Sequence, residues 1–247
     1  MILSSHAFSE AYGAENQDAF LTSKLKPNVF FAAVADGVGG HAGGSIAANI
    51  AIATAKELLE GNCDFSFSEV CDQICLRMEQ KSAESPELSE MATTLTLVMI
   101  TGSQARFCHI GDSRIYHLRN KGLMQVTEDQ SEVALLLRQG ILDKESAKKY
   151  PRKSVLYSAL SARRNFEINE GAFNILENDR VVLMTDGAYR LAPKTLIRDF
   201  SLTSVNAVAF VDKIAAHVAN RGAKDDYTIV CVESIAEPCE NDILSNS

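Results

Sequence analysis

Apolar and polar positions along the chain fall into blocks that separate strand-like from helix-like segments. Short apolar runs bounded by glycine, asparagine or aspartate are typical of strands. The strands predicted in this way are residues 2–8, 18–22, 29–35, 180–185 and 227–233. Between residues 93 and 127, further runs of this kind alternate with short turns, which predicts an antiparallel meander.

Other segments repeat their apolar residues at helical spacing. From Ser45 onward, Ile46 and Ile50 share one face, and several alanines keep this helix slim enough to lie close against a sheet. A second helix is expected to be capped by Ser68 and to be followed by a polar surface loop at 82–90. A long amphipathic helix precedes the last strand, with its in-phase apolar residues at Val208, Val211, Ala215 and Val218.

A polar segment with helical character interrupts the strands in the middle of the chain. Ser131 is suited to begin a helix there and Gly140 to end it, and a second short helix is predicted near 144–149. Such an excursion usually lies on the rim of a sheet. It is either a flap that faces a substrate or a surface decoration, and the pattern does not separate the two.

Aspartates occupy the ends of several predicted strands. Two apolar strands stop at an Asp-Gly pair, Asp36-Gly37 and Asp186-Gly187. The glycines that follow Asp36 allow the backbone to come close to a bound ion or phosphate. Three more aspartates lie at tight turns or strand boundaries, namely Asp18, Asp112 and Asp225. Each alone is most often a solvated cap, so the question is whether the fold gathers them.

A gathered set of carboxylates without His or Cys partners would repel itself unless cations neutralised it. Hard oxygen ligands of this kind select Mg²⁺ or Mn²⁺. Two such ions roughly 3.5–4 Å apart can activate a water and hold both oxygens of a phosphoryl displacement. The residues therefore predict metal-assisted hydrolysis of a phosphoester.

Composition narrows the class of protein. The 247 residues are 46% hydrophobic, which favours one compact domain, and the net charge of -8 argues against a nucleic-acid or anionic membrane surface as partner. No apolar run is long enough to span a bilayer and the first residues do not resemble a signal peptide, so a cytoplasmic protein is expected. The six cysteines form no CxxC pair and are predicted to be reduced and structural rather than zinc ligands.

Taken in order, the motifs resemble a known family. The chain is similar, from Gly13 to about Val232, to bacterial metal-dependent serine/threonine protein phosphatases of the type 2C-like family. The motifs that carry the resemblance are Asn16-Gln17-Asp18, residues 35–41, Thr93-Thr94, Gly111-Asp112-Ser113-Arg114, residues 129–131, Thr185-Asp186-Gly187 and Asp225-Asp226. Any one of them is weak evidence, whereas the ordered set is specific.

The resemblance implies a fold and a domain organisation. It implies an α+β fold, a four-layer α-β-β-α sandwich in which two antiparallel sheets are flanked by helix pairs. Residues 1–235 would form a single catalytic domain with a small helical flap at about 131–155, and residues 236–247 a polar tail.

The resemblance also implies a metal site and a reaction. Asp36 would bridge two ions, Mn²⁺ or Mg²⁺, and the Gly37 carbonyl would bind the first, whose water Asp18 would hold. Asp186 and Asp225 would complete the second site, and Asp112 resembles the ligand of a third, weaker ion. Asp36, Asp186 and Asp225 would be the catalytic residues. A hydroxide between the first two ions would attack phosphorus directly, without a phosphoenzyme.

The partners that follow are a phosphorylated protein as substrate and a cognate Ser/Thr kinase, with a monomer as the default state. The sharpest departure from the family pattern is Gly13, which stands where an arginine usually grips the phosphate. Arg114 or Arg163 could replace that arginine, although an ion pair beside Asp112 is the favoured interpretation for Arg114.

Other departures concern proton transfer and flap docking. Val38 stands where many eukaryotic members have a histidine, and His41 is expected to be structural. Gln130 replaces a histidine, and Ser158, Ser161 and Asp226 replace an arginine, a glycine and an asparagine.

Two alternatives to the enzyme remain. A phosphoprotein-binding pseudophosphatase with weak or no turnover is supported by Gly13, whereas the intact carboxylates favour the enzyme. A metal-dependent nuclease would share the chemistry but would need a basic track for the nucleic-acid backbone, which the acidic balance disfavours.

Overall fold

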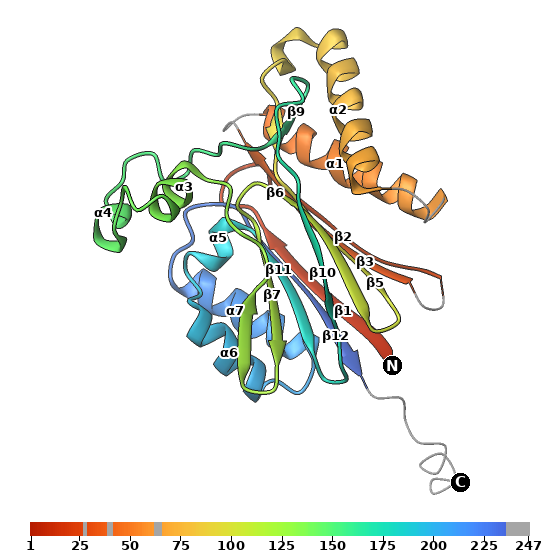
Figure 1. The fold of residues 1–247 in the computed structure, drawn as a ribbon, viewed down its shortest axis with the longest axis vertical. Coiled ribbons are helices and arrows are strands. Elements are labelled where there is room, and N and C mark those ends of the chain that lie inside the picture. The colour runs from red at the N-terminus through yellow and green to blue at the C-terminus, as the bar shows by residue number, and fades with distance from the viewer. Residues whose placement is uncertain (27–28, 39–41, 62–65, 236–247) are drawn as a thin grey trace, which may run out of the picture.

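The fold is a sandwich of two antiparallel sheets, each covered on its outer face by helices (Figure 1). It is seen in a computed structural model that describes residues 1–26, 29–38, 42–61 and 66–235. The predicted α+β sandwich is confirmed. The predicted tail at 236–247, His41 and two of the cysteines, Cys63 and Cys239, lie outside the described residues.

The first sheet has five strands in the order β1-β12-β11-β7-β8. Their bounds are Ile2–Glu10, Tyr227–Ile235, Arg180–Met184, Arg114–Arg119 and Gly122–Gln125. Helices α6 (Lys194–Thr203) and α7 (Ala207–Asn220) cover this sheet, and Phe210 and Ile214 of α7 are fully buried in the same apolar cluster as Val182 of β11.

The second sheet has seven strands built around β3 (Val29–Val38), which pairs with β2 on one side and β5 on the other. The other strands are β2 (Asp18–Lys26), β4 (Ala92–Thr93), β5 (Leu95–Thr101), β6 (Gln104–Ile110), β9 (Leu160–Ser161) and β10 (Asn169–Asn174). Helices α1 (Ala42–Gly61) and α2 (Phe67–Glu84) cover its outer face (Figure 1).

The continuous apolar run of β3 reflects burial on both of its faces. Phe31, Ala33 and Ala35 pack into the cluster under α1 and α2. The alternate residues, Phe30 and Val34 among them, pack into the cluster between the two sheets. Because neither face of this strand meets water, its sequence does not alternate between apolar and polar residues.

The predicted meander between 93 and 127 is wrong in its pairing. Strands β5 and β6 form one hairpin and β7 and β8 another, but β7 pairs with β11 of the first sheet and not with β6. The turn at Gly111-Asp112 therefore carries the chain from one sheet to the other, with Gly111 at a φ of 108°. Local alternation gives the same pattern in either case, so the sequence could not distinguish them.

Three local predictions also differ from the structure. The residue that caps α2 is Ser66 rather than Ser68, because Ser66 and Glu69 form a reciprocal capping box. The predicted loop at 82–90 instead contains the end of α2 and a short 3₁₀ turn, Pro86–Leu88. Strand β10 and helix α6, like the short β9 and α5, were not predicted from the pattern.

The helical excursion forms as predicted, with α3 (Glu132–Arg138) and α4 (Lys144–Lys148). Ser131 occupies the position before α3, although its side chain makes no capping hydrogen bond, and Gly140 follows the helix at a φ of 71°. This segment projects from one end of the sandwich (Figure 1).

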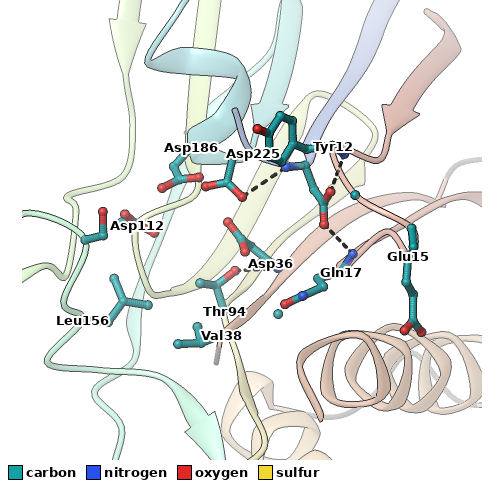
Figure 2. Close-up of a pocket in the computed structure, with 15 residues that line it drawn as sticks. Tyr12, Glu15, Gln17, Asp36, Val38, Thr94, Asp112, Leu156, Asp186 and Asp225 are labelled. Atoms are coloured by element: carbon teal, nitrogen blue, oxygen red, sulfur yellow. Dashed lines mark hydrogen bonds between the residues drawn. The ribbon is translucent and has the colours of Figure 1, made fainter. Parts of the chain in front are cut away.

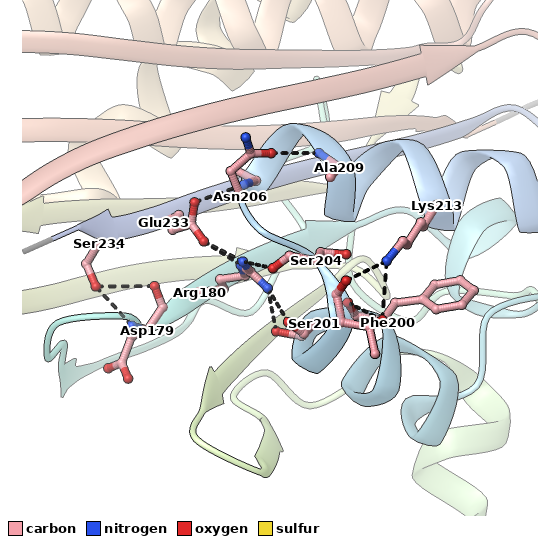
Figure 3. Close-up of polar contacts among 12 residues, drawn as sticks. Asp179, Arg180, Phe200, Ser201, Ser204, Asn206, Ala209, Lys213, Glu233 and Ser234 are labelled. Atoms are coloured by element: carbon pink, nitrogen blue, oxygen red, sulfur yellow. Dashed lines mark hydrogen bonds and ion pairs between the residues drawn. The ribbon is translucent and has the colours of Figure 1, made fainter.

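A buried ion pair anchors the α6–α7 connection to the first sheet (Figure 3). Arg180 of β11 donates to Glu233 of β12 at 2.8 Å from Nε, and its Nη2 also donates to the carbonyl of Ser204 at 2.9 Å. Glu233 in turn accepts the backbone N–H of Ala207, at 2.9 Å, where α7 begins. Since both charges are satisfied by fixed partners, this network holds the helix pair in place.

The described cysteines agree with the prediction of reduced, structural residues. Cys71, Cys75, Cys108 and Cys231 are all buried and free. Burial raises the pKa of Cys75 to about 11, which keeps it an unreactive thiol. Within the described residues, no helix is both long and apolar enough to cross a membrane.

Candidate metal centre

The predicted acidic residues surround a pocket of about 450 Å³ at one end of the sandwich (Figure 2). Its acidic lining residues include Asp36, Asp112, Asp186 and Asp225. They come from the end of β3, the turn between β6 and β7, the start of α5 (Asp186–Tyr189) and the entrance to β12. The two sheets therefore bring together residues that are far apart in the sequence.

Three of these carboxylates lie close enough to share an ion. Asp36, Asp112 and Asp186 each offer an oxygen, and these oxygens lie within 4.8 Å of one another. Asp112 and Asp186 are buried, and Asp36 is half-buried at the pocket floor. In Figure 2, Asp225 lies beside Asp186 and both point toward Asp36.

The main chain of Asp36 is held by the neighbouring β4–β5 segment. Its N–H donates to Thr94 Oγ1 at 2.9 Å, and its carbonyl accepts from Thr94 N at 2.9 Å and from Thr93 Oγ1 at 3.0 Å. This clamp explains the Thr-Thr motif. Fixing the backbone on both sides leaves the carboxylate of Asp36 free to face the pocket.

Gly37 has to be a glycine because a helix passes directly over it. A Cβ at Gly37 would lie 2.3 Å from the backbone of Gly44 in the first turn of α1. The N–H of Gly37 donates to the Gln17 carbonyl at 3.1 Å. The glycine-rich motif thus lets β2, β3 and α1 meet beside the pocket.

The second Asp-Gly pair packs against the entrance to β12 in the same way. A Cβ at Gly187 would lie 2.2 Å from the carbonyl oxygen of Asp226. The N–H of Asp226 donates to Asp225 Oδ1 at 3.1 Å, which orients the Asp225 carboxylate. Asp186 and Asp225 therefore occupy neighbouring positions because Gly187 has no side chain.

Asp18 lies behind the pocket rather than in its lining. It is buried and pairs with Asp36 across the β2–β3 ladder, and it accepts a hydrogen bond from Thr185 Oγ1 at 2.8 Å. Thr185 also accepts from the N–H of Thr228 at 2.9 Å. Asp18 is thus held next to the cluster by side chains and main chain of both sheets.

Burial and mutual repulsion hold the pKa values of these carboxyls high. Burial raises the pKa of Asp18 and of Asp112 to about 7, and nearby carboxylates add to the rise. The pKa of Asp36 is raised well above its usual value, first by burial and then by the charges of Asp18, Asp186, Asp112 and Asp225. Such a cluster attracts cations strongly when its carboxylates are ionised.

The side of the pocket near Gly13 offers no cation. Tyr12, Gly13, Ala14 and Glu15 line it, and within the described chain no Lys or Arg lines this pocket. The loop is tied down by Asp226, which accepts the N–H of Tyr12 and that of Gln17, each at 2.7 Å. A Cβ at Gly13 would meet no heavy atom within 4 Å, so there is room for a side chain.

Neither proposed substitute for the missing arginine reaches this pocket. Arg114 forms the expected ion pair, but its partner is Asp129 rather than Asp112, with bonds of 2.8 and 2.6 Å, and its guanidinium lies 3.6 Å from the centre of the Tyr189 ring. Arg163 is exposed and pairs with Glu90.

The substitutions near the flap leave its attachment satisfied. Gln130 is buried, accepts the N–H of Gly111 at 2.8 Å and donates to the carbonyl of Glu167 at 2.9 Å, so it fixes the turn that carries Asp112. Ser158 accepts the N–H of Glu167 at 2.9 Å. Beyond the flap helices, Ser154 and Leu156 line the pocket together with Val38.

Arg190, which was not predicted as a site residue, lies at the edge of the cluster. Its Nη2 is 2.7 Å from Asp186 Oδ2 and 3.7 Å from Asp112 Oδ2. The spacing of four residues after Asp186 on a helical turn was a usable signal, because residues at i and i+4 face each other.

Comparison with known proteins identifies the family of this chain and agrees with its fold. The family model described as Protein phosphatase 2C matches residues 7–226. A serine/threonine phosphatase stp of Listeria welshimeri is 31% identical over 231 residues, which is 88% of this chain and 90% of that protein. The chain belongs to the protein phosphatase 2C family.

Solved structures show the same architecture. The serine/threonine phosphatase PstP/Ppp of Mycobacterium tuberculosis superposes with a TM-score of 0.86 at 25% identity, covering 96% of this chain and all of that one. A catalytic domain of PstP in complex with two manganese ions gives a TM-score of 0.81 at 25% identity, covering 95% of this chain and 99% of that domain.

Proposed function

We propose that this protein is a metal-dependent phosphatase that removes phosphate from phosphoserine and phosphothreonine of proteins. The observation that carries this proposal is the convergence of Asp36, Asp112 and Asp186 within 4.8 Å at a pocket large enough for a phosphorylated side chain. Membership of the protein phosphatase 2C family and the phosphatase names of its relatives support the same substrate class.

The donor set fits Mn²⁺ or Mg²⁺. The candidate ligands are carboxylates and the Gly37 carbonyl, all hard oxygen donors, and burial, together with neighbouring carboxylates, raises the pKa values of Asp36 and Asp112. In this proposal Asp36 would hold both ions, Asp186 and Asp225 would complete the second site, and Asp18 would act from behind Asp36. The bound ions would supply an activated water for direct attack on phosphorus and neutralise the phosphate charge.

The test is hydrolysis of an aryl phosphate and a phosphothreonine peptide with added Mn²⁺. Asp186→Asn should lower kcat by about 100-fold or more, because it removes a charged ligand where two ions would be held. Asp199→Asn is a matched control, since Asp199 is exposed on α6 and pairs with its neighbour Arg198. Equal rates for the wild type and Asp186→Asn would exclude this metal centre as the catalytic site.

One observation favours a second candidate, a phosphoprotein-binding pseudophosphatase. The pocket wall at Gly13 carries no cation within the described chain, so the phosphate grip is weaker than the family pattern provides. Tight binding of a phosphopeptide without hydrolysis in Mn²⁺ would select this candidate.

A cognate Ser/Thr kinase, a monomeric state and a cytoplasmic location complete the proposal of a phosphatase.

A further inference from the structure

Arg190 is held among the acidic residues by partners from three parts of the chain. Its Nη2 lies 2.7 Å from Oδ2 of Asp186, which begins the short helix α5 that Arg190 directly follows, and 3.7 Å from Asp112 Oδ2, in the turn between the sheets. Its Nη1 donates to Ser154 Oγ, beyond the flap helices, at 3.2 Å. Three anchors fix the guanidinium at the side of the cluster where Asp112 and Asp186 approach each other.

The other arginine nearby does not serve this purpose. Arg114 donates to Asp129 from Nε at 2.8 Å and from Nη2 at 2.6 Å, and its Nη1 donates to the Tyr116 hydroxyl at 3.1 Å. Asp112 has polar contacts with Tyr189, whose hydroxyl donates to Oδ2 at 3.5 Å, and with Arg190 on the same oxygen. Among the described residues, Arg190 is therefore the cation whose guanidinium lies within 4 Å of both buried carboxylates.

A divalent ion and this guanidinium compete for the same oxygens. An ion bound to Asp186 Oδ2 at about 2.1 Å would lie within about 5 Å of Arg190 Nη2, where two positive charges repel. An ion shared by Asp112 and Asp186 on that side would have to displace Arg190 from them. Ions shared with Asp36 and Asp225 would then use the other oxygen of Asp186.

The charges of the cluster lead to the same expectation. The five carboxylates of Asp18, Asp36, Asp112, Asp186 and Asp225 carry five negative charges when ionised. Two divalent ions and one guanidinium balance that charge, while Asp226, which also lines the pocket, is engaged by the N–H groups of Tyr12 and Gln17.

We propose that Arg190 is a built-in counter-ion to Asp112 and Asp186, so that this chain holds two divalent ions and excludes a third from these carboxylates. This inference rests on the proposed metal-dependent function. Asp112 is then the partner of a positioning arginine and not the ligand of a third ion. The positions of Asp112 and Asp186 do not require that ion.

The test counts bound ions rather than turnover. Protein freed of metal is titrated with Mn²⁺ in phosphate-free buffer, and free Mn²⁺ is followed by electron paramagnetic resonance. The wild type should bind two ions. Arg190→Ala should bind a third at least tenfold more tightly than the wild type does, whereas Arg190→Lys, which keeps the charge, should bind two.

Controls separate the site from general charge effects. Arg198→Ala removes an exposed arginine that pairs with Asp199, and it should leave the count at two. Adding Asp112→Asn to Arg190→Ala should abolish the third ion. Circular dichroism verifies that each variant is folded, and Arg190→Gln, which also removes the charge, replaces Arg190→Ala if the alanine variant does not fold.

Two results overturn the inference: three ions of comparable affinity in the wild type, or an unchanged count of two in folded Arg190→Ala. A parallel hydrolysis assay distinguishes this failure from failure of the proposed function. A wild type that hydrolyses phosphopeptide while binding three ions leaves the function standing and removes the inference. A wild type that neither binds Mn²⁺ nor hydrolyses the peptide overturns both.

Discussion

At the scale of single residues, the candidate site depends on side chains whose positions are fixed through the main chain. Asp36 is clamped through its N–H and carbonyl by Thr93 and Thr94, and Asp225 is oriented by the next peptide N–H. Main-chain anchoring leaves the carboxylate oxygens available for other partners. Substitutions that keep the backbone in place should therefore change chemistry without unfolding the protein.

Gly13 provides a substitution of this kind. We expect Gly13→Arg to lower the KM for a phosphothreonine peptide by about tenfold, because one charge-assisted, bidentate hydrogen-bonded contact is worth roughly 1.5–3 kcal/mol. The pocket has room for the side chain, since a Cβ at Gly13 meets no heavy atom within 4 Å. Steady-state kinetics of the purified variant measure the change.

Gly61→Arg is the matched control for that experiment. Gly61 lies at the end of α1, does not line the pocket, and a Cβ there also meets nothing within 4 Å. An unchanged KM in Gly13→Arg, or an equal fall in Gly61→Arg, would contradict a phosphate-binding role for position 13.

At the scale of elements, strand ends carry the chemistry. Strands β3 and β11 each deliver an aspartate followed by a glycine, and each glycine allows another segment to approach closely: α1 at Gly37 and the entrance to β12 at Gly187. The interior of both strands is apolar and fully buried. The core of the sandwich therefore sets the positions of the acids at its end.

A methyl group at Gly187 tests whether close packing at this glycine sets the position of Asp225. Gly187→Ala would place a Cβ 2.2 Å from the Asp226 carbonyl oxygen, which must then move together with Asp225. We expect a loss of about 1–3 kcal/mol in the free energy of unfolding and weaker Mn²⁺ binding. Denaturant unfolding and Mn²⁺ titration measure the two effects.

Gly61→Ala serves as the control, because it adds the same methyl group where nothing lies within 4 Å. If Gly187→Ala unfolds and binds Mn²⁺ like the wild type, the contact between the turn and the entrance to β12 does not position Asp225.

At the scale of the whole molecule, folding brings several carboxylates close together that lie far apart in the unfolded chain. In the metal-free protein, Asp18 and Asp112 keep their protons up to a pKa of about 7, whereas an unfolded aspartate loses its proton near pH 4. Between these values the unfolded chain binds fewer protons, so the free energy of unfolding falls as pH rises.

His109 has the opposite effect on the free energy of unfolding over part of this pH range. Burial lowers the pKa of His109 to about 4, so below about pH 6.5 the unfolded chain gains a proton that the folded chain does not. The carboxyls of Asp18, Asp36 and Asp112 outnumber it. The net expectation is a metal-free protein that is more stable at pH 5 than at pH 8.

Thermal unfolding in EDTA measures this dependence. We expect Tm to fall by roughly 5 °C or more from pH 5 to pH 8. Saturating Mn²⁺ should restore Tm at pH 8, since cations stabilise the ionised carboxylates. Asp112→Asn should flatten the profile in EDTA. A Tm that rises from pH 5 to pH 8 without metal would show that ionisation of these carboxylates does not destabilise the folded protein.

The sequence by itself determined most of the local structure and the identity of the acids. The buried strands, the long helices and the strand-end positions of Asp36 and Asp186 follow from hydrophobic period and glycine placement, both of which are local properties. The same patterns failed where pairing is long-range. The segment from 93 to 127 divides between two sheets, and β10 was missed because its exposed residues, such as Glu170 and Asn174, carry little apolar signal.

Only the tertiary structure decided how the acids are arranged. The crossing at Gly111 brings Asp112 to Asp36 and Asp186, placing their oxygens within 4.8 Å of one another. The tertiary structure also places Asp18 outside the pocket lining and places Arg190 against Asp112 and Asp186. Distances between residues 70 or more positions apart depend on how the two sheets pair and pack, and packing is a property of the whole chain rather than of any local segment.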